Sequence, residues 1–184
     1  MISELIRAVE AQLETKPRVI VGIDGGAASG KTTLAATCSE ALGATLIHMD
    51  DYFLPPALRT PAREAEIGGN VHYERFYDEI VARLEANGPL LLRRYDCHLQ
   101  AYQEARLVEP AKAIIIEGCY SLHPRFRHIY DIMLVLSTDV RLQRERLLKR
   151  EGEKGLKAFE TRWIPLENAY LNTLSMPRDK IAAY

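Results

Sequence analysis

The sequence predicts an α/β fold: one domain spanning residues 1–184, in three layers, with a mostly parallel central sheet flanked by helices. Two observations lead to this prediction. Three apolar segments rich in β-branched residues have the length and composition of strands buried on both faces of a parallel sheet: 18–23, 113–116 and 130–136. Helix-length segments alternate with them, which is typical of parallel strands joined by right-handed crossovers.

Composition restricts the functional classes. The chain carries 24 basic and 25 acidic residues, a formal net charge of -1, which gives no indication of a nucleic-acid or membrane partner. Its three cysteines are an odd number without CxxC spacing, as is typical of reduced thiols and not of a disulfide framework or a zinc site. The longest apolar runs are only strand-sized. We therefore expect a cytoplasmic protein that does not span a membrane, and the sequence leaves a homo-oligomer open.

The first part of the chain contains its clearest motif. Residues 2–13 have the amphipathic pattern of a helix packed on the domain. After the strand at 18–23, residues 25–32 read GGAASGKT, the phosphate-binding P-loop pattern G-x-x-x-x-G-K-[ST]. A helix-length segment follows and ends at Gly43. Strand, glycine loop and helix thus come in the order that the motif needs.

This motif predicts a site for ATP and Mg²⁺. Its glycines allow backbone N–H groups to point at phosphate oxygens, at the positive end of the following helix. Lys31 adds a cation for the outer phosphates, and Thr32 offers a hydroxyl to the metal. The predicted nucleotide-binding residues are those of the loop and of the first helical turn: Gly25, Gly26, Ala27, Ala28, Ser29, Gly30, Lys31, Thr32 and Thr33.

A second predicted strand, 44–49, is followed by two aspartates. Because ligands of open α/β sheets collect at the carboxyl ends of the strands, Asp50 and Asp51 are placed for chemistry. If the strand extends through them, their side chains point to opposite faces. Residues 57–70 are rich in Arg, Glu, Pro and Gly without periodicity, which predicts a mobile excursion over the substrate side of the site.

The middle of the chain returns to regular structure. Residues 72–88 have the pattern of a helix that stops at Asn87-Gly88. A hairpin-like excursion is expected next, with its substrate-side part at 93–108. The strand that follows delivers Glu117 to its carboxyl end.

The last part of the chain is predicted to be mostly helical. An arginine-rich helix and the glycine-bearing turn after it form a predicted lid at 141–158. Its arginines are candidates for neutralising a transferred phosphoryl group. Pro165 imposes a kink or a new helix start in the final segment.

Other residues must decide which P-loop chemistry the chain performs. A GTPase switch would carry an Asn-Lys-x-Asp motif, which the sequence lacks. The aspartate pair, the strand-end Glu117 and the arginine-rich helix suit phosphoryl transfer to a small hydroxyl acceptor. The alternative explanation is that these residues have no catalytic role. The aspartates would then lie in a solvent-exposed turn, and the arginines on a solvent-exposed helix face.

With these motifs in place, the chain resembles the uridine kinase family of P-loop kinases, whose relatives include nicotinamide riboside kinase and phosphoribulokinase. The similarity lies in RVIVGIDGGAASGKTT, HMDDYFLPP, RRYDC, IIIEGCYSLHP and FETRWIPLENAY. The resemblance implies a P-loop NTPase fold with a helical lid, and it makes Asp50 the candidate general base beside Lys31. It also implies that Glu117 supports Mg²⁺ or the acceptor, and that Arg144 and Arg150 lie over the phosphates.

The residues expected to bind the acceptor, Asp51, Tyr52, His72, Tyr95 and Gln100, depart in part from the family. Nucleoside kinases of this family hold the ribose diol with an aspartate, and its counterpart here is His72, which cannot offer two anionic oxygens. Tyr95 matches the tyrosine of the base-reading hairpin, whereas Gln100 falls where a uridine-cytidine kinase has a histidine. Family members also end in a further strand, and we expect this chain to stop where that strand would begin.

The sequence therefore predicts a small-molecule kinase that moves the γ-phosphate of ATP to a hydroxyl of a nucleoside-like acceptor. Two alternatives remain open. One is a kinase of another small metabolite, such as a sugar or vitamin precursor. The other is a nucleotide-binding switch module that is not a kinase.

Overall fold

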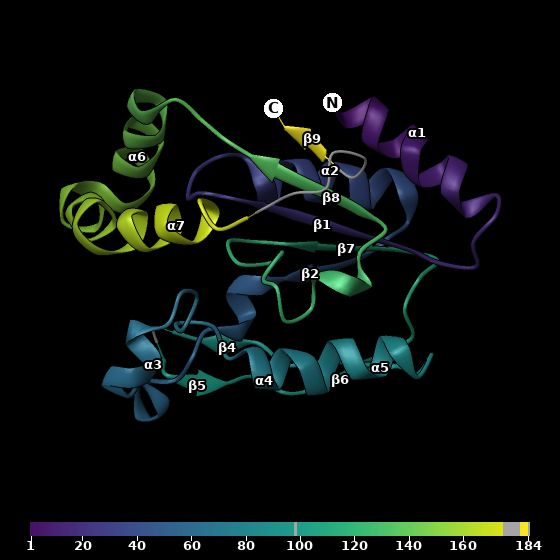
Figure 1. The fold of residues 1–184 in the computed structure, drawn as a ribbon, viewed down its shortest axis with the longest axis horizontal. Helices are drawn as coiled ribbons and strands as arrows, with labels where there is room; N and C mark the ends of the chain where they lie inside the picture. Colours follow the sequence, from purple (N-terminus) through teal and green to yellow (C-terminus); the bar gives the residue numbers. More distant parts are fainter. Residues whose placement is uncertain (98, 175–180, 184) are drawn as a thin grey trace.

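A computed structural model describes residues 1–97, 99–174 and 181–183. Its centre is a parallel sheet in the order β2-β7-β1-β8-β9 (Figure 1). The strands of this sheet are β1 (Val19–Gly25), β2 (Thr45–His48), β7 (Ala113–Glu117), β8 (Ile132–Leu136) and β9 (Ile181–Ala183). All pairings between these strands are parallel, so their carboxyl ends meet at one edge. The predicted α/β fold with a parallel sheet flanked by helices is confirmed.

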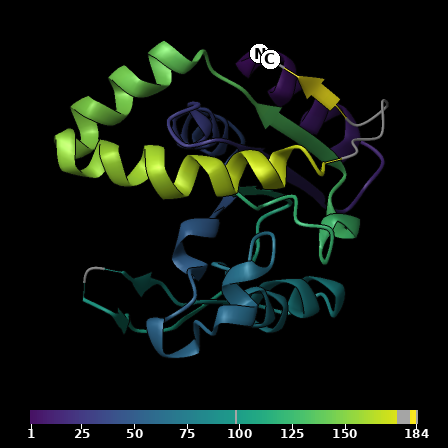
Figure 2. The ribbon, with the colours of Figure 1, turned by 60° about the vertical axis from the view of Figure 1, so that its left-hand side comes forward.

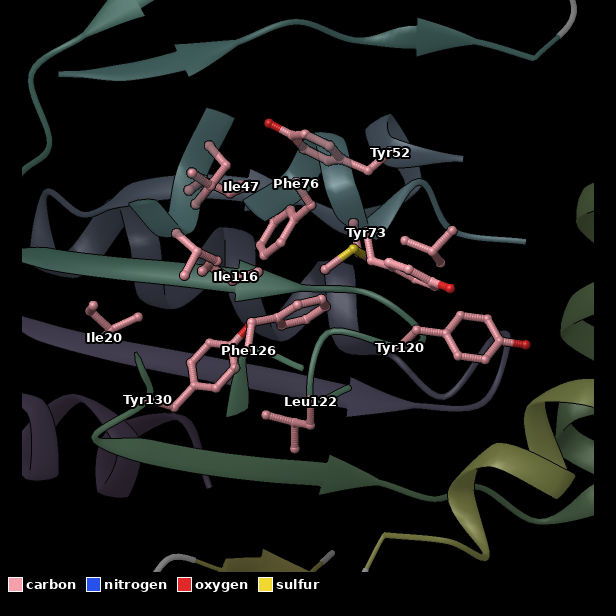
Figure 3. Packing of buried hydrophobic residues seen from close by; sticks show 14 of the residues in the cluster. Ile20, Ile47, Tyr52, Tyr73, Phe76, Ile116, Tyr120, Leu122, Phe126 and Tyr130 are labelled. Atoms are coloured by element: carbon pink, nitrogen blue, oxygen red, sulfur yellow. The ribbon is translucent and has the colours of Figure 1, made fainter. Parts of the chain in front are cut away.

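The central strands β1 and β7 are buried along their whole length, which explains why most of their residues are apolar. On one face, α1 (Ile2–Leu13) and α2 (Lys31–Leu42) pack with the alternate residues Val19, Val21 and Ile23 of β1. On the other face, Ile20 belongs to an aromatic-rich cluster with Phe76 and Phe126, whose ring centroids are 4.7 Å apart (Figure 3). This second cluster attaches the elements between β2 and β7 to the sheet.

Most of the elements between β2 and β7 lie below the sheet in Figure 1. A helical stretch and two short antiparallel pairings form most of this region, as the helix and hairpin patterns predict. The helical stretch comprises α4 (Tyr73–Phe76), the π-helical η3 (Tyr77–Val81) and α5 (Ala82–Glu85). The pairings join β3 (Leu90–Leu92) to β6 (Arg106–Val108), and β4 (Tyr95–Asp96) to β5 (Ala101–Tyr102). A 3₁₀ turn, η4 (Arg127–Ile129), precedes β8.

The stretch at 57–70 differs from the irregular excursion expected from its composition. It contains a 3₁₀ turn, η2 (Pro56–Leu58), and a short helix, α3 (Pro61–Ala65). Arg63 fixes the segment, because its guanidinium donates to the carbonyls of Gly69 and Val71 and pairs with Glu74 at 2.7 Å. These long-range bonds leave no periodic signal in the sequence.

The two C-terminal helices lie beyond the carboxyl ends of the strands. Helix α6 (Val140–Ala158) begins at Asp139, whose carboxylate accepts from the N–H groups of Arg141 and Leu142. The helix breaks at Gly152, where φ is 69°, as the glycine-bearing turn in the sequence predicts. A π-helical turn, η5 (Phe159–Trp163), leads into α7 (Ile164–Leu171), which contains Pro165 in its first turn. Figure 2 shows these helices folding back on each other.

The prediction that the chain stops before a last strand is wrong. Strand β9 pairs with β8 at the sheet edge, with Met133 opposite Ile181. The strand has only three residues, which is too short for its pattern to be recognised. In the described ranges, no helix combines the length and the hydropathy that a membrane crossing requires.

Candidate active site

The P-loop connects β1 to α2 as the motif requires. Gly25 has φ of 140°, and a Cβ there would lie 2.1 Å from the carbonyl oxygen of Leu136, so only glycine allows this close strand contact. Gly30, with φ of 98°, caps α2. The buried Lys31 folds back over the loop, and its ammonium donates to the carbonyl of Gly26 at 2.8 Å. Residues 27–33 line a cavity of about 1260 Å³, whereas Gly25 and Gly26 begin the loop outside it.

Thr32 and Glu117, the two predicted metal ligands, lie in contact with each other. The hydroxyl of Thr32 lies 3.2 Å from both carboxylate oxygens of Glu117, which is almost fully buried at the end of β7. His48, at the end of β2, contacts the same carboxylate through Nδ1 at 2.6 Å. This hydrogen bond raises the pKa of His48, because the carboxylate favours the imidazolium.

The donor set at this point fits Mg²⁺. Among the described residues there is no group of three or more His, Cys, Asp or Glu side chains that could hold a metal ion alone. Mg²⁺ in phosphoryl-transfer sites needs only one or two protein oxygens, since phosphates and waters complete its octahedron. The Thr32 hydroxyl and the Glu117 carboxylate are hard oxygen ligands of that kind.

The aspartate pair lies beyond the second strand, not within it. Strand β2 ends at His48, and the chain turns into the 3₁₀ helix η1 (Met49–Tyr52). The opposite-face argument for Asp50 and Asp51 therefore does not hold, because it needs an extended strand. Both side chains line the cavity all the same.

The two aspartates have different surroundings. Asp50 is open to the cavity, and burial by the surrounding walls raises its pKa, an effect that the charge of Lys31 opposes. Asp51 is half-buried and lies 3.4 Å from the guanidinium of Arg94. Burial raises the pKa of Asp51 as well, while the charges of His48 and Arg94 lower it. No arginine of the described residues forms an ion pair with Asp50, whereas Arg94 pairs with Asp51.

Two of the predicted acceptor residues line the cavity with Asp51, and two do not. Tyr95 and Gln100 line it from the β4–β5 hairpin. The buried hydroxyl of Tyr95 has no hydrogen-bond partner among the described residues. Tyr52 packs in the core at 1% exposure, with Arg75 over its ring. His72 caps α4, where its Nδ1 accepts from the N–H of Arg75 at 3.1 Å, so it lies outside the cavity lining.

The arginines of α6 divide into two groups. Arg144 pairs with Glu160 at 3.1 Å and does not line the cavity. Arg150 lines the cavity while it pairs with its neighbour Glu151 at 2.6 Å. Arg146, which the sequence did not single out, also lines the cavity and donates to the carbonyl of Ala28 in the P-loop at 2.9 Å. Helical spacing could not tell which arginines face the loop until the axis of α6 was known.

A buried network behind the P-loop was also missed. The carboxylate of Asp24, fully buried in β1, accepts from the hydroxyl of Tyr170 at 2.6 Å and from the N–H of Leu122 at 2.9 Å. Burial raises the pKa of Asp24, and these hydrogen bonds oppose the increase. The only signal in the sequence was an acidic residue within an apolar strand.

The cavity therefore joins two sets of chemical groups. One set comprises Lys31, Thr32 and Glu117 with Arg146 and Arg150 of α6. The other comprises Asp50, Asp51 and polar side chains from the elements between β2 and β7: Arg59, Asn70, Arg94, Tyr95 and Gln100. Two carboxylates thus share one cavity with the P-loop.

Comparisons with known proteins agree with this arrangement. No protein-family model matches the chain. Uridine kinase from Geobacillus sp. (strain WCH70) is 30% identical over 151 residues, which are 76% of this chain and 71% of the relative. Uridine kinase from Clostridium perfringens (strain 13 / Type A) is 27% identical over 169 residues, which are 86% of this chain and 78% of the relative.

Solved structures give the same fold. A possible uridine kinase from Bacillus stearothermophilus has a TM-score of 0.69 at 25% identity, covering 94% of this chain and 90% of its own. D-glycerate 3-kinase from Cryptococcus neoformans var. grubii has a TM-score of 0.70, covering 100% of this chain and 94% of its own. The second is 15% identical, so it shows the fold alone.

Proposed function

Because the chain belongs to the uridine kinase family of P-loop kinases, and is therefore an ATP-dependent phosphotransferase acting on a hydroxyl, we propose that Asp50 activates that hydroxyl. The observation that carries this proposal is the position of Asp50, open to the cavity that residues 27–33 of the P-loop also line. A general base must come within hydrogen-bond reach of the proton that it abstracts. An acceptor in this cavity would lie between Asp50 and the phosphate site.

In the proposed reaction, Asp50 orients the acceptor hydroxyl and takes its proton. The hydroxyl oxygen forms a bond to the γ-phosphorus, the bond from that phosphorus to the bridging oxygen breaks, and ADP leaves. Lys31, Arg146 and Arg150 neutralise charge on the transferring group. Mg²⁺, when bound, would shield the β- and γ-phosphate oxygens, and Thr32 with Glu117 would hold it.

The relatives make a nucleoside the first candidate acceptor. The pocket supports a second candidate, a small metabolite that is not a nucleoside. A ribose diol is well held by a carboxylate, and the counterpart of that carboxylate is His72, which caps a helix and lies outside the cavity lining. Burial also lowers the pKa of His72, which keeps it neutral at physiological pH.

The test is ADP release from MgATP in the presence of nucleosides, sugars and vitamin precursors, followed by isolation of the phosphorylated product. Acceptor-dependent ADP release that Asp50→Asn abolishes supports the proposal. ATP hydrolysis that no acceptor accelerates, and that Asp50→Asn leaves unchanged, would instead favour a nucleotide-binding switch.

A further inference from the structure

Two arginines near the aspartate pair, Arg75 and Arg93, are bound by the protein itself and do not line the cavity. The buried Arg75 pairs with Glu79 at 3.0 Å and donates to the carbonyls of Arg93 and Asp51. Arg93 pairs with the same Glu79 at 2.6 Å. Both guanidiniums thus share the Glu79 carboxylate outside the cavity lining.

Arg59 is different. It lines the cavity, and its Nε donates to the carbonyl of Leu54 at 2.9 Å. No carboxylate of the described residues forms an ion pair with it, whereas Arg94, also in the lining, has Asp51 as a partner. A bond through Nε fixes the plane of the guanidinium and leaves its two terminal amino groups as a fork. Such a fork matches the two oxygens of a carboxylate or phosphate.

Two neighbouring groups show that Arg59 faces the same space as the catalytic carboxylate. Burial raises the pKa of the Cys97 thiol, while the charge of Arg59 lowers it and the charge of Asp50 raises it. The thiol therefore lies within electrostatic range of both groups. Tyr95, whose buried hydroxyl has no hydrogen-bond partner in the part of the chain that the structure describes, also lies within range of the Arg59 charge. A buried hydroxyl without a partner is costly, as expected of a group that a ligand completes.

We propose that the acceptor is an alcohol that carries an anionic group, a carboxylate or a phosphate, and that Arg59 binds this group while the hydroxyl meets Asp50. The inference rests on the proposed kinase function and names its substrate class. Arg59 is then a specificity residue, which determines acceptor binding and leaves the chemical step to Asp50. A neutral nucleoside would leave the Arg59 fork without a partner.

The test compares acceptors in pairs that differ in their anion. The carboxylate pairs are glycerol with D-glycerate and glucose with gluconate. The phosphate pairs are ribulose with ribulose 5-phosphate and uridine with uridine 3′-monophosphate. We expect kcat/KM for the anionic member of at least one pair to exceed that of its neutral partner by roughly 10- to 100-fold, as for other charge-assisted hydrogen bonds. A preference within the carboxylate pairs would identify the anionic group as a carboxylate, and a preference within the phosphate pairs would identify it as a phosphate.

Variants attribute the effect to Arg59. Arg59→Gln should raise the KM of the anionic acceptor by a similar factor, with kcat and the KM for ATP changed little. Arg59→Lys should retain part of the preference, because it keeps the charge but loses the fork. The matched control is Arg106→Gln, which removes an exposed arginine of β6 outside the cavity lining.

The possible results separate this inference from the proposed function. If neutral members are phosphorylated equally well or better, or if Arg59→Gln affects both members of a pair alike, the inference is overturned and the kinase function stands. If no compound is phosphorylated, the proposed function fails and the inference falls with it.

A second measurement does not depend on the acceptor. Cys97 is exposed in the cavity, whereas Cys38 and Cys119 are buried. Iodoacetate is an anion and iodoacetamide is neutral. The rate of Cys97 alkylation by iodoacetate divided by the rate with iodoacetamide therefore reports the positive charge near the thiol. Arg59→Gln should lower that ratio about threefold, as expected for one charge screened by water at a few ångströms. An unchanged ratio would contradict the position assigned to Arg59.

Discussion

The carboxylate of Glu167 in α7 accepts a hydrogen bond from the backbone N–H of Ala27 in the P-loop, at 2.8 Å. Gln143 of α6 holds the other side of the loop by donating to the carbonyl of Ala27 at 2.9 Å. The two C-terminal helices therefore fix the conformation of a loop that lies more than one hundred residues earlier in the chain.

Replacing Glu167 should loosen the P-loop. Glu167→Ala leaves the Ala27 N–H without its acceptor, which we expect to cost about 1–3 kcal/mol in the free energy of unfolding and to raise the KM for ATP. Glu167→Gln keeps an acceptor oxygen and should be much milder. Urea unfolding and ATP titration provide the measurements, with the exposed Glu153→Gln as control. Equal effects of the Ala and Gln variants would show that charge, not the hydrogen bond, matters.

Lys31→Ala should weaken ATP binding and nearly abolish turnover. The ammonium lies over the loop on the carbonyl of Gly26, where it is available to the outer phosphates. Circular dichroism establishes that the variant is folded, and calorimetry with ATP measures its affinity. Full activity in a folded variant would contradict the assignment of the nucleotide site.

Asp50→Asn should keep ATP affinity within a few-fold and lower acceptor phosphorylation by roughly 10²- to 10⁴-fold, the usual contribution of a general base. Asp51→Asn should mainly raise the KM of the acceptor, because Asp51 is held by Arg94 at 3.4 Å. Steady-state kinetics of the two variants give the comparison. A chemical step that needs Asp51 but not Asp50 would reverse the two roles.

The pH dependence of the reaction should carry the signature of Asp50. Burial raises the pKa of Asp50 above the ordinary value of 3.8, and a base must be ionised, so kcat should fall as pH decreases through that raised pKa. The free energy of unfolding changes in the opposite direction with pH. Because the folded state binds the proton of Asp50 more tightly than the unfolded state, the protein loses stability as pH rises from 3.8 through the raised pKa. The acidic limb of the kcat profile should be absent in Asp50→Asn.

Arg146→Ala should lower kcat more than it raises the KM for ATP, since the charge that it neutralises is greatest in the transition state. Arg144→Ala is the matched control from the same helix, because Arg144 pairs with Glu160 outside the cavity lining. Arg150→Ala tests the second candidate lid arginine. If all three variants lose thermal stability but keep their kcat, the arginines have no role in catalysis and form only a solvent-exposed helix face.

The sequence predicted the features that depend on local patterns. The apolar strands, the P-loop with its flanking elements and the glycine break in α6 all have short-range signals, and the structure confirms them. Thr32 and Glu117 could be expected near each other, because the P-loop helix begins and β7 ends at the carboxyl ends of parallel strands.

The features that were missed depend on contacts between distant segments. The side chains of Asp50 and Asp51 were expected on opposite faces only if the strand extended through them, and nothing local shows that β2 ends at His48. Arg59, Arg146 and Glu167 acquire their positions only when loop, lid and sheet are assembled. Sequence spacing cannot show which of several arginines another side chain already holds.

The order of strands in the sheet also has a consequence for biosynthesis. Strand β1 lies between β7 and β8, so the first strand to be made has no partner until the ribosome has reached residue 113. Its seven residues, all of which are buried in the folded protein, remain unpaired until then, a condition that favours aggregation and slow, non-local folding. Nascent chains truncated before β7 should therefore be bound by chaperones, whereas those that include β8 should begin to release them.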